Sequence, residues 1–319
     1  MRPAFSIILF TTASGAGYGL LALIGLLAAL RALPVSASAG LAGAGLALVL
    51  VSAGLLSSTF HLRHPERAWR AVTQWRSSWL SREGAIALLT YVPALALIAG
   101  LALFGEGSAL VRWSGLAASA CATATTFCTG MIYASLKPVR EWREPLTVPV
   151  YLGLALASGA LFLLAIATLS GVSRPWLAAL ALVLLAAAWG LKLIYWRALA
   201  RTASGPTVES ATGLKGLGKV RLLDPPHTET NYLLHEMGYR IARKHARKLR
   251  LVALLAGGLA PGAATVSLFW AVGISAAVLA VLGASLALAG LLVERWLFFA
   301  EATHTVTLYY GAGRAGGAT

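Results

Sequence analysis

The sequence is short of cysteine, of charged residues and of histidine inside its apolar stretches, and each shortage excludes a class of protein. Cys121 and Cys128 are the only two cysteines among 319 residues. Both stand in one apolar stretch, where a helix would separate them by about 10 Å along its axis. Two such thiols cannot form a disulfide with each other, and they cannot supply the four ligands of an iron–sulfur cluster. The sequence therefore predicts no iron–sulfur cluster in this chain.

Charged residues are scarce as well. Aspartate, glutamate, lysine and arginine make up only 12% of the sequence, whereas hydrophobic residues make up 58%. These proportions lie outside the range of soluble domains and are typical of an integral membrane protein. A bilayer core about 30 Å thick needs about 20 apolar residues for each helix that crosses it. The apolar runs are long and do not alternate with polar residues, which predicts helices rather than the strands of a barrel.

Eight membrane-spanning helices are expected, which gives an all-α polytopic membrane protein with one integral membrane domain over residues 1–319. No charged residue stands between Arg250 and Glu294. One helix of that length would measure about 65 Å, so the stretch must cross the membrane twice, with a turn near Gly273. The expected spans are Ser6–Leu30, Ala39–Phe60, Gly84–Phe104, Leu110–Leu136, Val148–Leu169, Trp176–Trp196 and two helices between Leu251 and Phe299.

The distribution of basic residues predicts the orientation of these spans. Of the 26 lysines and arginines, only Arg31, Arg112 and Arg174 fall on one side, Lys192 lies inside the sixth span, and the rest share the other side. The positive-inside rule then places both termini in the cytoplasm. The formal net charge of +15 fits this topology and an anionic lipid surface or protein partner. Nucleic acid is not an expected partner, because no basic soluble domain is present to bind it.

Histidine is missing from the middle of every span. All six histidines fall at or beyond span ends on the basic side: His61, His64, His227, His235, His245 and His304. A haem held by two histidines in a helical bundle needs both ligands within the spans, so a subunit without haem is predicted. His61 and His64 have no clear third ligand, and no metal site is predicted from them.

A dense polar cluster between the second and third spans, within Phe60–Gly84, is the first candidate site. Pro65 is expected to end the second helix and Glu83 to open the third. Histidine and glutamate across one short connection can each accept a hydroxyl proton when a hydroquinone loses two electrons. Arginine and tryptophan at such a place also serve as anchors among lipid headgroups, and this alternative stays open. The candidate quinone-binding residues are His61, Glu83, His64, Arg67, Trp75 and Arg82.

A second cluster closes the eighth span. Glu294 and Glu301 would share one helix face, and Glu301 and His304 would be neighbours one turn apart. A di-iron site needs two such glutamate–histidine pairs and further carboxylates, so one copy is insufficient. Two interpretations remain: an ion pair inside the membrane between Glu294 and Arg295 or another helix's arginine, and a second wall of the quinone site formed by Glu294, Glu301 and His304.

The largest soluble segment, residues 197–250, is expected to be a cytoplasmic basic loop. It contains a predicted amphipathic helix over 230–250, which Thr228 or Thr230 can cap and which ends in lysines and arginines. The segment is the natural docking surface for a cytoplasmic partner, and anchoring of its basic residues to lipid headgroups is the alternative.

The motifs of both clusters resemble those of a known family, the membrane anchor subunits of dimethyl sulfoxide reductase-type molybdenum enzymes. The resemblance covers essentially the whole chain. It rests on His61-Leu-x-x-Pro65 with the following loop rich in arginine and tryptophan, on Leu80-Ser81-x-Glu83, and on the closing stretch from Glu294 to His304. The last motif looks particularly like that of the anchors of cytoplasmic sulfite dehydrogenases within this family.

The resemblance implies an eight-helix subunit without haem in the bacterial inner membrane. Such a subunit holds a molybdopterin catalytic subunit and an iron–sulfur subunit, has no molybdopterin itself, and exchanges electrons with ubiquinone or menaquinone. His61 and Glu83 match the family's quinol-site histidine and glutamate. Arg63 stands where the family commonly has glycine, which affects the expected loop conformation and leaves both titratable side chains in place.

Three functional hypotheses therefore stand. In the first, the chain is a quinone-reactive subunit whose partner oxidises sulfite or reduces a sulfoxide. In the second, it is a purely structural membrane anchor without a quinone site and without catalysis of its own. The third, a secondary transporter, would need polar groups near the middle of the membrane, where the sequence offers only small ones such as Thr123 and Thr125.

Overall fold

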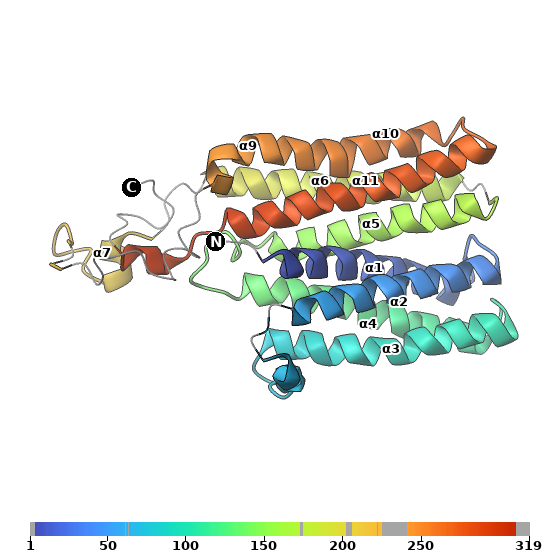
Figure 1. The fold of residues 1–319 in the computed structure, drawn as a ribbon, viewed down its shortest axis with the longest axis horizontal. Coiled ribbons are helices and arrows are strands. Elements are labelled where there is room, and N and C mark those ends of the chain that lie inside the picture. The colour runs from blue at the N-terminus through green and yellow to red at the C-terminus, as the bar shows by residue number, and fades with distance from the viewer. Residues whose placement is uncertain are drawn as a thin grey trace.

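The computed structural model describes residues 4–60, 62, 64–172, 175–201, 206–221, 223–224 and 241–310, without the side chains of 241–244. Within these residues it has eight helices long and apolar enough to cross a membrane and no β-strand. This confirms the all-α fold with eight spans. The helices lie side by side along one long axis (Figure 1).

The boundaries of the spans agree with the sequence-based ranges to within a few residues at most ends. The turn expected near Gly273 is confirmed, because α10 ends at Ser267 and α11 begins at Gly273, whose φ of 59° suits glycine. The spans are α1 (Phe5–Ala29), α2 (Ala37–Thr59), α3 (Trp79–Phe104), α4 (Ala109–Ala134), α5 (Thr147–Leu169), α6 (Pro175–Arg201), a seventh built from α9 (Ile241–Leu254), the π-helical turn η2 (Leu255–Leu259) and α10 (Ala260–Ser267), and α11 (Gly273–Ala300). The short helices η1 (Pro65–Val72), α7 (Val208–Thr212) and η3 (Thr305–Leu308) lie outside the spans.

The start of the third span differs from the prediction. The helix begins at Trp79, because the side chain of Ser78 caps it by accepting a hydrogen bond from the backbone N of Ser81 at 3.5 Å. Glu83 therefore does not open the helix but lies in its second turn. Pro65 does not directly follow the second helix either, since α2 ends at Thr59 and Pro65 begins η1.

The predicted loop 197–250 is shortened at both ends. Helix α6 continues to Arg201, and α9 is helical from Ile241 onwards. Between them the structure describes α7 and an exposed stretch that follows it. The proposed caps Thr228 and Thr230, and the first half of the predicted amphipathic helix, lie outside the described residues.

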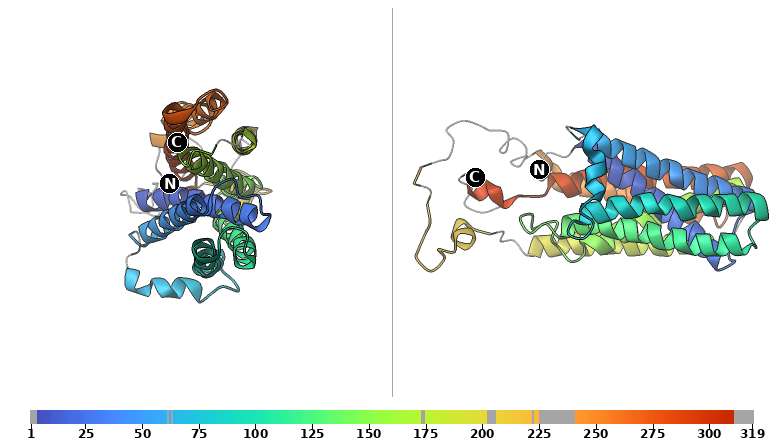
Figure 2. Two further views of the ribbon diagram at one scale, coloured as in Figure 1. Left: turned by 90° about the vertical axis from the view of Figure 1, so that its right-hand side faces the viewer. Right: turned by 90° about the horizontal axis from the view of Figure 1, so that it is seen from below.

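Helix α1 occupies the middle of the bundle, where it packs against α2, α4, α5 and α11 (Figure 2). Two glycines allow α1 and α5 to approach backbone to backbone. A Cβ atom on Gly19 would lie 1.7 Å from the carbonyl oxygen of Ala155, and one on Gly159 would lie 2.2 Å from the carbonyl carbon of Gly19. Small residues at such crossings are typical of membrane helices, which gain stability from close contact rather than from leaving water.

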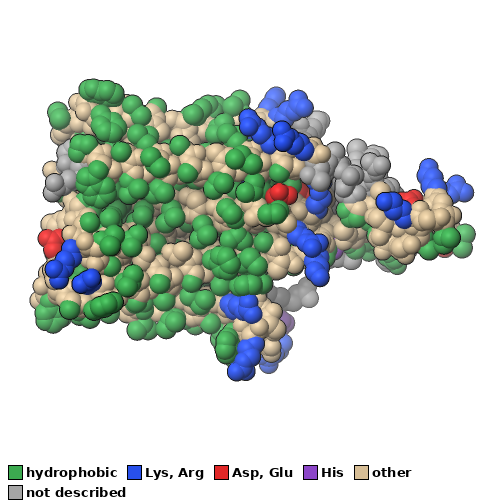
Figure 3. All heavy atoms as spheres, turned by 180° about the vertical axis from the view of Figure 1, so that it is seen from behind, with side chains coloured by type: hydrophobic (Ala, Val, Ile, Leu, Met, Phe, Trp, Pro, Cys, Tyr) green, Lys and Arg blue, Asp and Glu red, His purple; other side chains and the backbone are tan. Residues whose placement is uncertain are grey.

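Lysine and arginine gather at the end of the bundle where α1 begins and α11 ends, which we call the basic end (Figure 3). Helix η1 also lies there and projects sideways from the bundle (Figure 2). The placement of this end in the cytoplasm stays a prediction from the positive-inside rule.

Substitution of Gly19 or Gly159 by alanine should destabilise the bundle, because the added methyl group overlaps backbone atoms of the other helix. Overpacking of this kind costs roughly 1–3 kcal/mol or more. Thermal unfolding in detergent and the amount of protein in the membrane measure the effect. Gly45→Ala is the matched control, because a Cβ at Gly45 meets nothing within 4 Å. Equal stability of all three variants would contradict the close crossing.

Candidate functional site

Glu83 is a buried carboxylate near the basic end of the bundle. Its side chain projects from the second turn of α3 and is only 4% exposed. Oε1 accepts a hydrogen bond from the hydroxyl of Thr129 on α4, and that hydroxyl also lies 3.0 Å from the carbonyl oxygen of Thr125. A carboxylate buried in a spanning helix is costly, which marks Glu83 as a candidate functional residue.

The loop that contains η1 is fastened to the first turns of α3, beside Glu83. The hydroxyl of Ser81 donates to the carbonyl oxygen of Ala71. Arg82 donates from Nε to the carbonyl oxygen of Trp75 at 2.9 Å and from Nη2 to that of Arg76 at 2.7 Å. Its guanidinium also lies 4.3 Å from the ring centre of Trp79. These contacts fix the loop against the helix that carries Glu83.

The structure brings only part of the first predicted cluster together. Arg82 and Trp75 meet through the backbone, as described. His64 and Arg67 are exposed, and each faces Glu66 instead, with Nδ1 of His64 at 3.0 Å and Nε of Arg67 at 3.7 Å from Oε1. Among the described residues, neither contacts Glu83. His61 lies outside the described residues.

Glu294 is the centre of a buried ion-pair cluster with Lys192 and Arg295. All three side chains are inaccessible, at 0%, 1% and 4% exposed. Oε1 of Glu294 pairs with Nζ of Lys192 on α6, and Oε2 lies 3.1 Å from Nε of Arg295. The predicted pair of Glu294 with Arg295 is confirmed, and the partner on another helix is a lysine rather than an arginine.

Arg295 and Lys192 also lie against aromatic rings. The guanidinium of Arg295 is 3.7 Å from the ring centre of Tyr151 on α5, and Nζ of Lys192 is 4.2 Å from that of Tyr195. Cation–π contacts of this kind are strongest where the cation is shielded from water. The first contact joins α5 to the end of α11, and the second lies within α6.

Glu301 and His304 lie apart from Glu294. Helix α11 ends at Ala300, so the expected helical spacing between Glu301 and His304 is wrong. Glu301 receives two hydrogen bonds of 3.1 Å from the guanidinium of Arg250 in the seventh span. His304 accepts a hydrogen bond at Nδ1 from the backbone N of Val306 at 3.0 Å. The second wall of the quinone site expected from Glu294, Glu301 and His304 stays a prediction.

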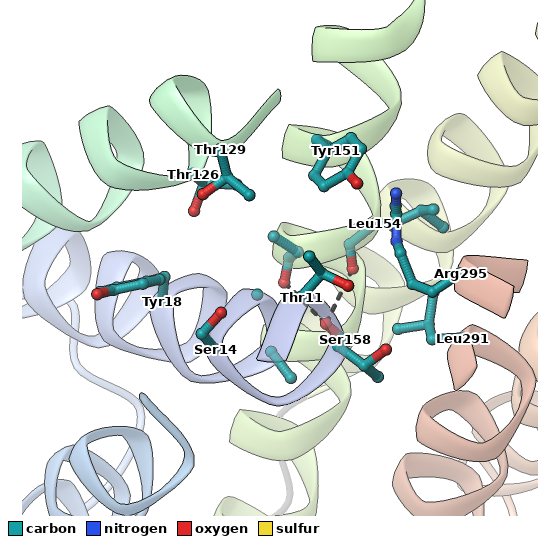
Figure 4. Close-up of a pocket in the computed structure, with 14 residues that line it drawn as sticks. Thr11, Ser14, Tyr18, Thr126, Thr129, Tyr151, Leu154, Ser158, Leu291 and Arg295 are labelled. Carbon is teal, nitrogen blue, oxygen red and sulfur yellow. Dashed lines mark hydrogen bonds between the residues drawn. The ribbon is translucent and has the colours of Figure 1, made fainter. Parts of the chain in front are cut away.

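A narrow cavity lies among α1, α4, α5 and α11, with Thr129 and Arg295 on its wall (Figure 4). Thr129, the partner of Glu83, lines one side and Arg295 the other. The space open to water is about 20 Å³, enough for about one water molecule and too small for a quinone ring. Among the described residues, four buried polar atoms on its wall make no hydrogen bond of good geometry: Thr12 Oγ1, Tyr18 OH, Tyr151 OH and Arg295 Nη1.

Sequence reasoning did not assign Lys192, Tyr151 or Thr129 to a site. Lys192 had a usable signal, because a lysine within an apolar span must find a partner. Single hydroxyl groups such as those of Thr129 and Tyr151 carry no comparable signal, since most of them in spans bond their own helix.

No group of three or more histidine, cysteine or acidic side chains comes close enough to hold a metal ion in the described part of the chain. Cys121 and Cys128 are both free thiols. The expectations of no haem, no iron–sulfur cluster and no metal in this subunit stay predictions.

Comparisons with known proteins bear on the whole chain. Residues 1–311 match the family described as DMSO reductase anchor subunit (DmsC). A sulfite dehydrogenase subunit from Allochromatium vinosum is 38% identical over 333 residues, which cover 97% of this chain and 99% of that protein. No solved structure matches the chain.

Replacing Lys192 by methionine should destabilise the bundle by roughly 1–3 kcal/mol, because Oε1 of Glu294 loses its buried donor while Arg295 still compensates the carboxylate's charge. The thermal unfolding midpoint and the amount of protein in the membrane report this. Lys137→Met is the control, since Lys137 is exposed in the α4–α5 connection. Unchanged stability of Lys192→Met would contradict the ion pair's role.

Lowering the pH from about 7 to about 5 should reduce the stability of the folded segment that follows α11. Burial lowers the pKa of His304, and an Nδ1 atom that accepts a hydrogen bond cannot carry a proton. Below the unfolded-state pKa of about 6.5, the unfolded chain binds more protons than the folded one. The stability contributed by neutral His304 is therefore present above that pH and is lost as pH falls towards the folded-state pKa.

Thermal unfolding as a function of pH measures this loss. The matched variant is His304→Asn, which keeps an acceptor and does not titrate in this range. The same pH dependence in both proteins would contradict the assignment to His304.

Proposed function

Because the chain belongs to the family of DMSO reductase anchor subunits (DmsC), we propose that it is the quinone-reactive membrane subunit of a molybdoenzyme complex. The chain anchors an iron–sulfur subunit and a molybdopterin catalytic subunit at its basic end, and electrons pass between the nearest cluster and a quinone. The name of the relative in Allochromatium vinosum supports sulfite as the substrate of the catalytic partner. The anchor itself has no catalytic residue for that substrate.

The observation that carries the proposal is the position of Glu83. Its carboxylate is buried at the depth of the second turn of α3, where the polar loop meets the apolar part of the bundle. A quinol releases two protons as it loses two electrons, and each proton needs an acceptor within hydrogen-bonding reach. Glu83 accepts one of them, and the hydroxyl of Thr129 holds the carboxylate in place.

His61 provides the second acceptor in this proposal. Helix α2 ends at Thr59, two residues before His61, and the loop between α2 and α3 connects it to Glu83. Imidazole exchanges protons near neutral pH, which suits a group that must accept and release one in each turnover. The exposed ring of Trp75 and the side chains of the loop arginines contact the quinone headgroup from the side of the loop.

The residues present fit a quinone in chemistry, with a carboxylate acceptor beside aromatic rings at the lipid boundary. The ring of Trp79 at the start of α3 packs edge-on against Phe127 of α4, with 6.0 Å between ring centres, on the lipid-facing side. The cavity behind Glu83 is too small for the ring. Quinone therefore approaches from the lipid side of α3 and α4, and the η1 loop shifts to admit it.

The proposed orientation places this chemistry in the cytoplasm. Sulfite electrons then reduce quinone, and the protons are taken from the same side of the inner membrane. The reaction moves no charge across the membrane. A partner that reduces a sulfoxide would use the same site in the opposite direction.

Glu83→Gln should reduce quinone-coupled turnover of the assembled complex by at least 100-fold, because an amide can neither deliver a proton to a quinone nor accept one from a quinol. Activity of the catalytic subunit with a soluble electron-acceptor dye should be unchanged. Glu66→Gln is the matched control in the same loop, since its carboxylate is exposed and does not contact Glu83.

Binding of a fluorescent quinone analogue to the purified complex separates this proposal from a purely structural anchor. The wild type should bind the analogue and quench its fluorescence, and the Glu83→Gln complex should bind it more weakly. Full quinone-coupled turnover in Glu83→Gln, or no analogue binding by the wild type, would reject the quinone site.

A further inference from the structure

The buried cluster of Lys192, Glu294 and Arg295 does not balance its own charge. It combines two cations with one carboxylate, and all three side chains are at most 4% exposed. An uncompensated charge at this depth is costly, because neither lipid nor the apolar bundle can solvate it. A second carboxylate is therefore expected within reach of the cluster.

Three carboxylates at the basic end are candidates for this second carboxylate. Glu301 is neutralised by its two-pronged pair with Arg250. Glu141 is partly exposed and accepts hydrogen bonds from the backbone and hydroxyl of Thr303 at 3.0 and 2.6 Å. Glu83 has no cation partner among the described residues, and its side chain is buried. Of the three, only Glu83 is both buried and unpaired.

The cavity of Figure 4 has on its wall both Thr129, the hydrogen-bond partner of Glu83, and Arg295, a member of the cluster. Thr129 connects its wall to Glu83, and Arg295 connects it to Glu294. The ring of Tyr151 on the same wall has its centre 3.7 Å from the guanidinium of Arg295.

The polar atoms on this wall need an acceptor. The hydroxyl of Thr12 and Nη1 of Arg295 are donors without a hydrogen bond, and the hydroxyls of Tyr18 and Tyr151 make none of good geometry, although Tyr18 lies near Thr125 and Tyr151 near Arg295. Buried donors are almost always satisfied, and a polar space of about 20 Å³ is large enough for water. A water molecule here can accept from Arg295 and donate towards the Thr129–Glu83 side.

We propose that Glu83 is the counter-charge of Arg295 through water bound in this cavity, so that Lys192, Arg295, Glu294 and Glu83 form one buried set without net charge. Arg295 is then a positioning residue for Glu83, although the two belong to helices far apart in the sequence. The charge set does not depend on the proposed quinone reaction. One consequence of the charge set does rest on the proposed function. A proton taken up by Glu83 leaves the set with one excess positive charge, which favours transfer of that proton to another group.

The charge set is tested by combining substitutions in the full complex. Arg295→Gln leaves one excess negative charge, Glu83→Gln leaves one excess positive charge, and the double variant restores neutrality. Each single variant should lower the thermal unfolding midpoint of the anchor in detergent by several degrees. The unfolding midpoint of the double variant should be higher than that of Arg295→Gln, although both variants lose the stacking of Arg295 on Tyr151. Additive losses in the double variant would overturn the proposal.

Arg295→Gln/Glu66→Gln is the matched control, since it removes an exposed carboxylate of the same end and should give no rescue. If Arg295→Gln does not accumulate in the membrane, the amount of protein is compared instead of the midpoint. The Arg295→Gln/Glu83→Gln double variant should then accumulate where Arg295→Gln does not. Equal rescue by Glu66→Gln and Glu83→Gln would also overturn the proposal, because it would show an effect of net protein charge alone.

Radiolytic hydroxyl labelling tests the water directly. Bound water should label the rings of Tyr151 and Tyr18, which are shielded from bulk solvent. Tyr195 is the control, because it is equally buried but donates to the carbonyl oxygen of Glu141 at 2.7 Å and does not line the cavity. Labelling of Tyr151 and Tyr18 no greater than that of Tyr195 would overturn the water link.

The stability and quinone experiments can fail independently. Full quinone-coupled turnover in Glu83→Gln would reject the proposed function and leave the stability comparison intact. A loss of midpoint in the double variant equal to the sum of the two single losses would reject the charge set and leave the turnover assay intact.

Discussion

The contact of Glu294 with Lys192 and Arg295 is the interaction on which the basic end of the bundle depends. Once a carboxylate and two cations are removed from water, they must stay together, because separating them within an apolar bundle costs several kcal/mol. The contact fixes α6 to α11, and the stacking of Arg295 on Tyr151 adds α5. The aromatic rings around it complete the packing, with Tyr133, Trp142, Tyr151, Phe298 and Phe299 in mutual contact.

The basic end thus has two parts of different character. On the side of α5, α6 and α11, charges and rings are buried and packed against one another, which favours a rigid platform. On the side of α2 and α3, η1 has no buried residue and is held to α3 by a few hydrogen bonds. Glu83 stands where the two parts meet. A rigid carboxylate beside an adjustable loop is a suitable arrangement for a site that admits a ligand from the lipid.

The sequence predicted the spans well, because twenty apolar residues in a row have few alternatives in a membrane protein. It also predicted the pair of Glu294 with Arg295, since neighbours in sequence cannot lie far apart. It placed the start of α3 at Gly84 because Glu83 resembled a helix-opening residue, whereas the cap of Ser78 begins the helix five residues earlier. Lys192 as the second partner of Glu294 could not be read from the sequence, because it depends on how α6 and α11 are rotated against each other. The same holds for the cavity, whose wall combines residues from α1, α4, α5 and α11.

The central position of α1 has a consequence for the order of synthesis. The ribosome makes α1 first, yet its glycine-mediated partner α5 arrives only after three further spans, and its contact with α11 only at the end of translation. Until then α1 has only its earlier partners, α2 and α4, and the part of its surface that meets α5 and α11 stays uncovered. Insertion of the first span and closure of the core around it are therefore separate events.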